Sequence, residues 1–218
     1  MRPPKLVIFD CDGILVDTEK LANRRLSAWL TEAGYPASYE HCRKYFCGRS
    51  LVSVQQEIEA EGLSLGADFV ERWYRELPDL FADGVEAVPH IENFIAAVQA
   101  AGIASCVASS ARVDKMHLTL GRTGLLPHFR DVLFSATMVE RGKPFPDLFL
   151  HAAASMNCAA QDCIVIEDSV AGTQAGIAAG MRVFSYHGDP HSDREGLAAA
   201  GGILFDDMRK LAALVPIG

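Results

Sequence analysis

Two acidic residues interrupt the apolar run near the start of the chain. In LVIFDCDGILVD, residues 6–17, Asp10 and Asp12 stand two positions apart and bracket a single cysteine. Carboxylates this close repel one another, so they must pick up protons or share a cation. A metal ion and a phosphoryl group placed among them would make the pair tolerable.

The elements that would position these acids alternate between strand and helix from about residue 87 onward. Short runs rich in β-branched residues predict strands at 5–10, 103–110, 131–135, 163–168 and 182–186, and 201–205 is a candidate for a sixth. Apolar residues at helical spacing predict helices over 91–102, 113–124, 144–157 and 170–180. The alternation indicates an α/β fold: a Rossmann-like, three-layer core with a mostly parallel sheet.

One region breaks this alternation. Between residues 18 and 81 no strand is predicted, and helices are predicted over 19–34, 51–62 and 68–81. A segment of about sixty residues is too long for a simple loop, so we interpret it as a helical insert. We therefore expect a core domain of residues 1–16 and 84–218 and an α-helical cap domain of residues 17–83.

Polar residues stand where the predicted strands end. The first strand ends in Asp10, the second in Ser109 and the fourth in Glu167 and Asp168, while Lys143 follows the third strand in the loop RGKPFPD. Taken singly, each is explained by a turn, a helix cap or a solvated loop. Together they would meet at one edge of the sheet, because the carboxyl ends of parallel strands lie there. Carboxylates so close together need a hard divalent cation, and Mg²⁺ suits an oxygen-rich site with few protein carboxylates.

Four segments of the chain carry a family resemblance. In order and spacing, DCDGILVD, VASS, GKPFPD and IEDSVAG resemble the four motifs of the haloacid dehalogenase (HAD) superfamily of phosphotransferases. The helical insert looks like that superfamily's small cap. The chain is most similar to the β-phosphoglucomutase-like phosphatases, and KMHLTLGRTGLLPHF and AGMRVFSYHGDPH look most like the 6-phosphogluconate phosphatase type.

The resemblance implies a role for each acid. Asp10 would be the nucleophile that forms an aspartyl-phosphate. Asp12 would be the general acid toward the leaving alcohol and then the general base for water, and its backbone carbonyl would touch the metal. Asp168 would be the second carboxylate ligand of Mg²⁺ beside Asp10. Glu167 would help to hold the metal, directly or through water.

The resemblance also implies how a small phosphorylated metabolite, a sugar or sugar-acid phosphate, would bind. Ser109 and Lys143 would hold the phosphoryl oxygens. Gly13 would let the backbone approach the phosphate, and Ser110 would add a nearby contact. In the cap segment FCGRSL, Arg49 or its basic neighbours Arg43 and Lys44 would contact the part of the substrate remote from the phosphate. A solvated surface position for Arg49 is the alternative.

The chain departs from the family pattern at several positions. Position 14 is Ile where Thr or Val is usual, and Ser110 is followed by Ala111 where many relatives have an Asn. Asp12 is present, whereas true haloacid dehalogenases lack an Asp there, so we do not expect dehalogenation. Related sugar phosphomutases carry a His where this chain has Ala22 and an Arg where it has Leu51. A mutase, or an idle phosphometabolite-binding protein on the same scaffold, remains the alternative function.

Composition excludes other classes of protein. The chain has 218 residues and a formal net charge of -8, which disfavours nucleic acid and anionic membranes as partners. No apolar stretch approaches membrane-spanning length, and we expect a cytoplasmic monomer. The six cysteines contain no CxxC pair and are interpreted as reduced thiols. No two of the seven histidines are paired at a metal-ligand spacing, and Trp29, Trp73 and Tyr74 are interpreted as cap core.

Overall fold

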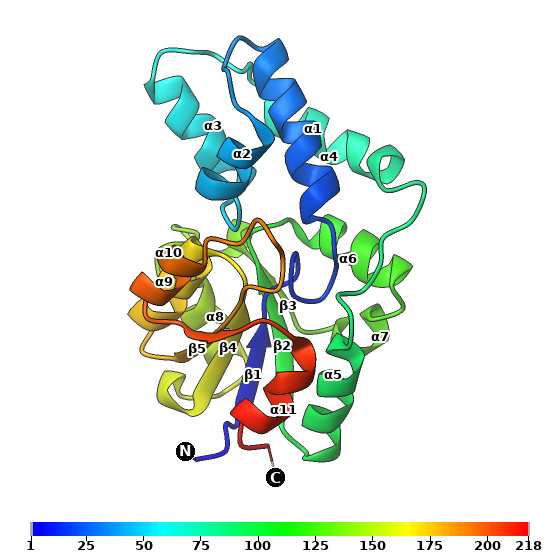
Figure 1. The fold of residues 1–218 in the computed structure, drawn as a ribbon, viewed down its shortest axis with the longest axis vertical. Coiled ribbons are helices and arrows are strands. Elements are labelled where there is room, and N and C mark those ends of the chain that lie inside the picture. Colours follow the sequence, from blue (N-terminus) through cyan, green and yellow to red (C-terminus); the bar gives the residue numbers. More distant parts are fainter. Residues whose placement is uncertain (1, 218) are drawn as a thin grey trace.

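The centre of the fold is a six-stranded parallel sheet, seen in a computed structural model that describes residues 2–217 (Figure 1). The strands are β1 (Leu6–Phe9), β2 (Ala104–Ser109), β3 (Leu133–Ser135), β4 (Cys163–Glu167), β5 (Arg182–Tyr186) and β6 (Ile203–Phe205). Their order is β3-β2-β1-β4-β5-β6, and each neighbouring pair runs parallel. The five predicted strands and the candidate sixth are all present, which confirms the α/β class.

Both faces of the sheet are covered by helices, as the uninterrupted apolar run of β1 requires. Val7 and Phe9 face one core, where Phe9 packs edge-on against Phe94 and Phe129 at ring-centroid distances of 6.0 and 5.7 Å. Leu6 and Ile8 face the other. The first core includes α5 (Ile91–Ala100), α6 (Val113–Arg122), α7 (Leu126–Phe129) and α11 (Leu211–Leu214), and the second includes α8 (Asp147–Ser155) and α9 (Val170–Ala178).

Four helices, α1–α4, follow β1 and lie beyond the carboxyl ends of the strands (Figure 1). They are α1 (Glu19–Glu32), α2 (Tyr39–Tyr45), α3 (Leu51–Ala60) and α4 (Phe69–Leu80). Trp29 packs against Phe69 and Trp73 with both centroid distances at 5.7 Å, so the interpretation of the two tryptophans as core of this segment is confirmed. Aromatic and apolar side chains of α1 and α4 thus hold the segment together.

The chain enters and leaves this helical segment at neighbouring positions. The backbone N–H of Asp17 donates to the carbonyl of Glu86 at 2.9 Å, and that of Val88 donates to the carbonyl of Leu15 at 3.1 Å. Two antiparallel connections, paired by hydrogen bonds, therefore join the segment to the sheet. Such a paired joint restricts where the segment can lie relative to the strand ends.

The shortest helices were not predicted. Helix α2 has seven residues, and α7, α10 (Arg194–Ala199) and α11 have four to six, too few to show a helical repeat of apolar residues. The 3₁₀ helices η1 (Ala136–Met138), η2 (Ala160–Asp162) and η3 (Met208–Lys210) were missed for the same reason. Among residues 2–217, no helix has the length and apolarity needed to cross a membrane.

Candidate active site

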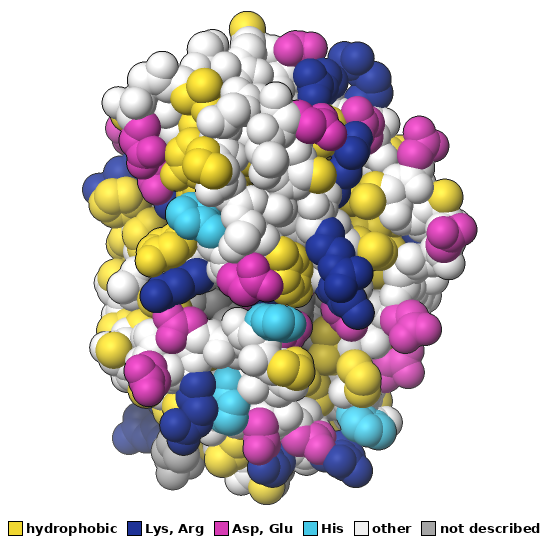
Figure 2. Space-filling view, turned by 45° about the horizontal axis from the view of Figure 1, so that its top comes forward, with side chains coloured by type: hydrophobic (Ala, Val, Ile, Leu, Met, Phe, Trp, Pro, Cys, Tyr) yellow, Lys and Arg dark blue, Asp and Glu magenta, His cyan; other side chains and the backbone are white. Residues whose placement is uncertain are grey.

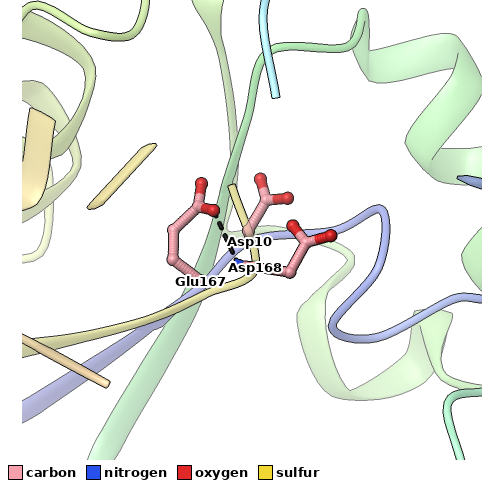
Figure 3. Close-up of side chains that lie close together, drawn as sticks. All are labelled: Asp10, Glu167 and Asp168. Carbon is pink, nitrogen blue, oxygen red and sulfur yellow. Dashed lines mark hydrogen bonds between the residues drawn. The ribbon is translucent and has the colours of Figure 1, made fainter. Parts of the chain in front are cut away.

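Three acids meet at the carboxyl edge of the sheet, as the strand-end pattern predicted. Asp10 directly follows β1, Glu167 ends β4 and Asp168 comes next. One carboxylate oxygen from each lies within 4.8 Å of the others. Figure 3 shows the three side chains projecting to the same side of the strand ends. Parallel pairing of β1 with β4 places them side by side although more than 150 residues separate them in sequence.

Lys143 brings the only positive charge that contacts this group among the described residues. Its ammonium lies 2.7 Å from Asp10 Oδ1 and 2.6 Å from Glu167 Oε1, and its side chain is fully buried. Burial disfavours the charged lysine, but the two carboxylates outweigh it and raise the pKa of Lys143 above its usual value. Lys143 therefore remains a cation against Asp10.

Glu167 has both of its oxygens engaged by the protein. Oε1 accepts from Lys143, while Oε2 accepts from the backbone N–H of Asp168 at 2.8 Å and from the N–H and hydroxyl of Ser169 at 2.7 and 2.9 Å. The buried carboxylate thereby fixes both the lysine and the loop after β4. Asp10 Oδ2 and both carboxylate oxygens of Asp168 accept no hydrogen bond from residues 2–217, so they keep free acceptor capacity.

The electrostatics of the site suit a bound cation. Burial raises the pKa of Asp10 to about 8, with Lys143 opposing and Glu167 adding to the rise. Burial also raises the pKa of Asp168 well above its usual value, and the negative charge of Glu19 adds to it. A divalent cation among these oxygens would favour their ionised forms. An all-oxygen donor set of carboxylates fits Mg²⁺.

Asp12 lies beside the cluster and has two partners that the sequence did not point to. The Thr18 hydroxyl donates to Asp12 Oδ1, and the Lys115 ammonium lies 2.8 Å from the same oxygen. Lys115 comes from α6, and its side chain is mostly buried. Nothing in the spacing of residues 12 and 115 links them. Only the packing of α6 beside β1 could have revealed the pair.

Glycines allow the site to close tightly. Gly13 has φ +81°, and a Cβ on it would overlap the Asp168 carboxylate. Gly172, in the first turn of α9, lies so close to Glu167 that a Cβ would overlap that carboxylate. The expectation for Gly13 was an approach of backbone to phosphate. The structure adds a second reason for a glycine here, because the Asp168 carboxylate occupies the space that a side chain at position 13 would need.

Of the cavities between the helical segment and the strand ends, two are bordered by Arg49. The larger has a volume of about 900 Å³ and is bordered by Arg49, Ser110, Lys143 and Asp168, among others. The smaller, about 90 Å³, is bordered by Asp10, Asp12, Ser109 and Lys115 from the sheet side and by Ala22, Arg49, Leu51 and Tyr74 from the helical side. Figure 2 shows basic, acidic and histidine side chains around the hollow in the middle of that face.

The three basic residues near the predicted substrate end differ in their surroundings. Arg49 borders both cavities and pairs with Glu57 on α3 at 2.6 Å. Arg43 is buried and pairs with Glu19 at 2.6 Å and with Asp189 at 3.5 Å, so protein partners already occupy it. Lys44 is exposed and lies over the ring of Tyr45. All three border the larger cavity, and of the three only Arg49 also borders the smaller one.

Other residues singled out from the sequence lie outside this acidic cluster. All six cysteines are free thiols, and four of them are buried, as the interpretation of reduced thiols requires. None of the histidines is fully buried, although His191 borders the larger cavity. Tyr74 differs from the core role expected of it: it is partly buried, borders both cavities and accepts a hydrogen bond from the backbone N–H of Arg112 at 3.2 Å.

Comparison with known proteins agrees with this geometry. Residues 7–186 match the family described as haloacid dehalogenase-like hydrolase. The chain belongs to this family. It is 38% identical over 188 residues to 6-phosphogluconate phosphatase of Escherichia coli, covering 85% of this chain and 84% of that one. It is also 27% identical to hexitol phosphatase A of the same organism, covering 86% and 85%.

A solved structure supports the membership. A conserved haloacid dehalogenase-like protein of unknown function from Agrobacterium tumefaciens matches with a TM-score of 0.78 and 32% identity, covering 97% of each chain. The family and its phosphatase relatives define the enzyme class of this haloacid dehalogenase-like hydrolase. It is a phosphoric monoester hydrolase. The dehalogenation that the sequence argued against is not needed to explain any of these similarities.

Proposed function

We propose that this phosphatase depends on Mg²⁺ and hydrolyses a small phosphorylated sugar or sugar acid through an aspartyl-phosphate on Asp10. The observation that carries the proposal is the contact between Asp10 and the buried Lys143 at 2.7 Å, next to the free carboxylate of Asp168. A buried carboxylate held beside a cation can approach a dianionic phosphate, which an unscreened carboxylate would repel.

Each residue then has a task in two steps. The carboxylate of Asp10 attacks phosphorus in line while Ser109 and Lys143 bind the phosphoryl oxygens, with Gly13 and Ser110 close by. Asp12 gives a proton to the leaving alcohol and then takes one from the water that hydrolyses the aspartyl-phosphate. Asp10, Asp12, Ser109 and Ser110 border the same small cavity and Lys143 borders the larger one, which supports this assignment.

The metal site that we propose uses the oxygens left free by the protein. Asp10, Asp168 and the backbone carbonyl of Asp12 would hold Mg²⁺, with Glu167 acting directly or through water. The occupied oxygens of Glu167 favour the indirect role. When bound, Mg²⁺ would neutralise phosphoryl charge and orient the phosphate.

Residues 17–83 serve in this proposal as a cap domain over a core of residues 1–16 and 84–218. The two paired connections near Asp17 and Val88 support a unit that joins the core at one place. The cap would exclude water from the phosphate, and Arg49 would contact the far end of the substrate. The names of the two Escherichia coli relatives support a sugar-acid or polyol phosphate as the substrate.

The alternatives are less well supported. Ala22 and Leu51 border the small cavity and present apolar surface where the mutase pattern has His and Arg. An idle binding protein would have no use for a buried lysine aimed at a carboxylate.

We propose a cytoplasmic monomer. The six free thiols support a reducing compartment.

The proposal is tested by hydrolysis of p-nitrophenyl phosphate with and without Mg²⁺, followed by a panel that includes 6-phosphogluconate and hexitol phosphates. We expect metal-dependent release of phosphate and a preference for one phosphorylated sugar or sugar acid. Interconversion of sugar phosphates without phosphate release would support the mutase instead. No turnover of any ester would support the binding protein.

A further inference from the structure

The carboxylate of Asp12 is held asymmetrically. Oδ1 is contacted twice, by the Thr18 hydroxyl and by the Lys115 ammonium at 2.8 Å. Oδ2 accepts no hydrogen bond from any described residue. It is nevertheless absent from the described side-chain atoms that are both buried and without a partner. Oδ2 therefore has exposed surface. Asp12 borders the small cavity together with Asp10 and Ser109, which places its side chain next to the nucleophile.

The two partners come from different parts of the fold. Thr18 lies at the N-terminal end of α1, in the helical segment, and its side chain makes no capping bond there. Lys115 lies on α6, which packs against the sheet. A lysine loses much hydration when its side chain is only 11% exposed, as that of Lys115 is, so a cation at this depth needs a compensating carboxylate. Among the described residues, Asp12 is the one with which Lys115 forms an ion pair.

We infer that Lys115 is a positioning residue for proton transfer: with Thr18 it holds Oδ1 of Asp12 and so leaves Oδ2 directed at the reacting oxygen. The inference rests on the proposed function, because it takes Asp12 to be the general acid and base. In the first step the proton on Asp12 moves to the ester oxygen as its bond to phosphorus breaks and the bond from Asp10 forms. In the second, Asp12 takes a proton from water as water attacks phosphorus and the bond to Asp10 breaks.

The orientation matters because proton transfer is sensitive to geometry. A general acid must lie within hydrogen-bond reach of the oxygen that it protonates. The Thr18 hydroxyl alone fixes one contact and leaves the carboxylate free to turn about it. The ammonium adds a second contact from a different element, α6. Lys115 also borders the cavity, so direct binding of substrate by Lys115 is the competing role that an experiment must separate.

The test compares two esters of similar size that need the acid to different degrees. The p-nitrophenolate group leaves without protonation, whereas the alkoxide of benzyl phosphate must be protonated as it leaves. We expect Lys115→Met to lower kcat/KM for benzyl phosphate about 10–100-fold, a part of what a general acid contributes, and to change that for p-nitrophenyl phosphate less than about threefold. Lys115→Arg, which keeps the charge, should recover most of the loss.

Three further variants sharpen the result. In the Asp12→Asn background, Lys115→Met should cause little additional loss, because the residue that it positions is no longer an acid. Thr18→Val removes only the hydroxyl that donates to the same Asp12 oxygen. It should show the same ester dependence, and it replaces Lys115→Met in the test if that variant does not fold. Lys5→Met removes an exposed lysine at the start of β1, far from the site, and should leave both esters unaffected.

The inference would be overturned if Lys115→Met lowered kcat/KM equally for both esters or for neither. A full additional loss of kcat/KM in the Asp12→Asn background would overturn it as well. Thermal unfolding of each variant separates misfolding from a specific effect. The proposed function fails separately, if wild-type protein hydrolyses neither ester in the presence of Mg²⁺. Wild-type turnover together with an ester-independent Lys115→Met defect would reject only the positioning role.

Discussion

The hydroxyl of Ser110 donates a hydrogen bond to the backbone carbonyl of Gly48 at 2.7 Å. Ser110 follows β2 at the sheet edge, and Gly48 lies between α2 and α3 in the helical segment, so this bond joins the two across the cavity. Gly48 has φ +75°, and a Cβ on it would overlap the Ser169 side chain. The helical segment thus meets the strand-end loops through a glycine that has no room for a side chain.

Gly48→Ala should therefore push the helical segment away from the strand ends. We expect kcat/KM to fall about tenfold or more, because small displacements of positioning groups are costly in catalysis. Gly62→Ala is the matched control, since Gly62 has φ +98° but nothing within 4 Å of its Cβ position. Both variants carry similar backbone strain, so only the overlap with Ser169 differs. Equal kinetics for the two variants would show that this contact does not govern the site.

Asp10→Asn should abolish turnover while the fold is kept. A neutral amide of the same shape cannot form the acyl-phosphate, so phosphate release should fall to background. Circular dichroism should match the wild type, because the amide fits the same space. Asp83→Asn, an exposed acid between α4 and α5, is the control and should remain fully active. Near-wild-type hydrolysis by Asp10→Asn would disprove the nucleophile assignment.

Mg²⁺ should bind to the free oxygens of Asp10 and Asp168. EDTA should remove activity and added Mg²⁺ should restore it. Calorimetric titration with Mg²⁺ provides a readout that does not depend on turnover, and Asp168→Asn should weaken the measured affinity at least tenfold. Glu167→Gln should weaken it less if Glu167 acts through water. Full activity in metal-free protein, or unchanged binding by Asp168→Asn, would count against this site.

The hydrogen bonds of the buried Glu167 carboxylate should contribute to the free energy of unfolding. Gly172→Ala places a methyl group against the fully buried carboxylate of Glu167, and overpacking of this kind costs about 1–3 kcal/mol of unfolding free energy. Gly121→Ala, on the exposed side of α6, meets only Leu126 at 3.9 Å and should stabilise the helix by about 0.5–1 kcal/mol. Chemical denaturation measures both. The prediction fails if the two alanines shift stability in the same direction.

The sheet and its strand-end acids could be predicted because both depend on local patterns. Strand β1 is apolar on both faces and is followed directly by Asp10, so its sequence alone indicates a central parallel strand with an acid at the ligand-binding edge. The order of the strands then brings Glu167 beside Asp10. The hydrogen bonds that saturate Glu167 could not be foreseen, because they depend on the exact course of the loop at Ser169.

Ion pairs between residues that are distant in the chain could not be predicted from the sequence. Arg43 was expected, with Lys44, as an alternative to Arg49 for contacting the substrate, yet it is buried between Glu19 and Asp189. Lys115, on a predicted helix, was not singled out from the sequence, yet it pairs with Asp12. Such pairs join residues that are distant in the chain and follow no repeat. They arise from the relative placement of elements, which no local pattern encodes.

Arg49 is expected to contact the part of the substrate that is remote from the phosphate. Its guanidinium borders both cavities and pairs with the partly exposed Glu57, an exchangeable partner that a substrate carboxylate could replace. Arg49→Ala should lower kcat/KM about 10–100-fold on the best sugar-acid or polyol phosphate and spare p-nitrophenyl phosphate, which has no such remote group. Arg75→Ala, an exposed arginine on α4, is the control and should change neither substrate. If Arg49→Ala impairs both substrates equally, the arginine supports the cap rather than the ligand. If it impairs neither, Arg49 is a surface charge paired with Glu57 and takes no part in recognition.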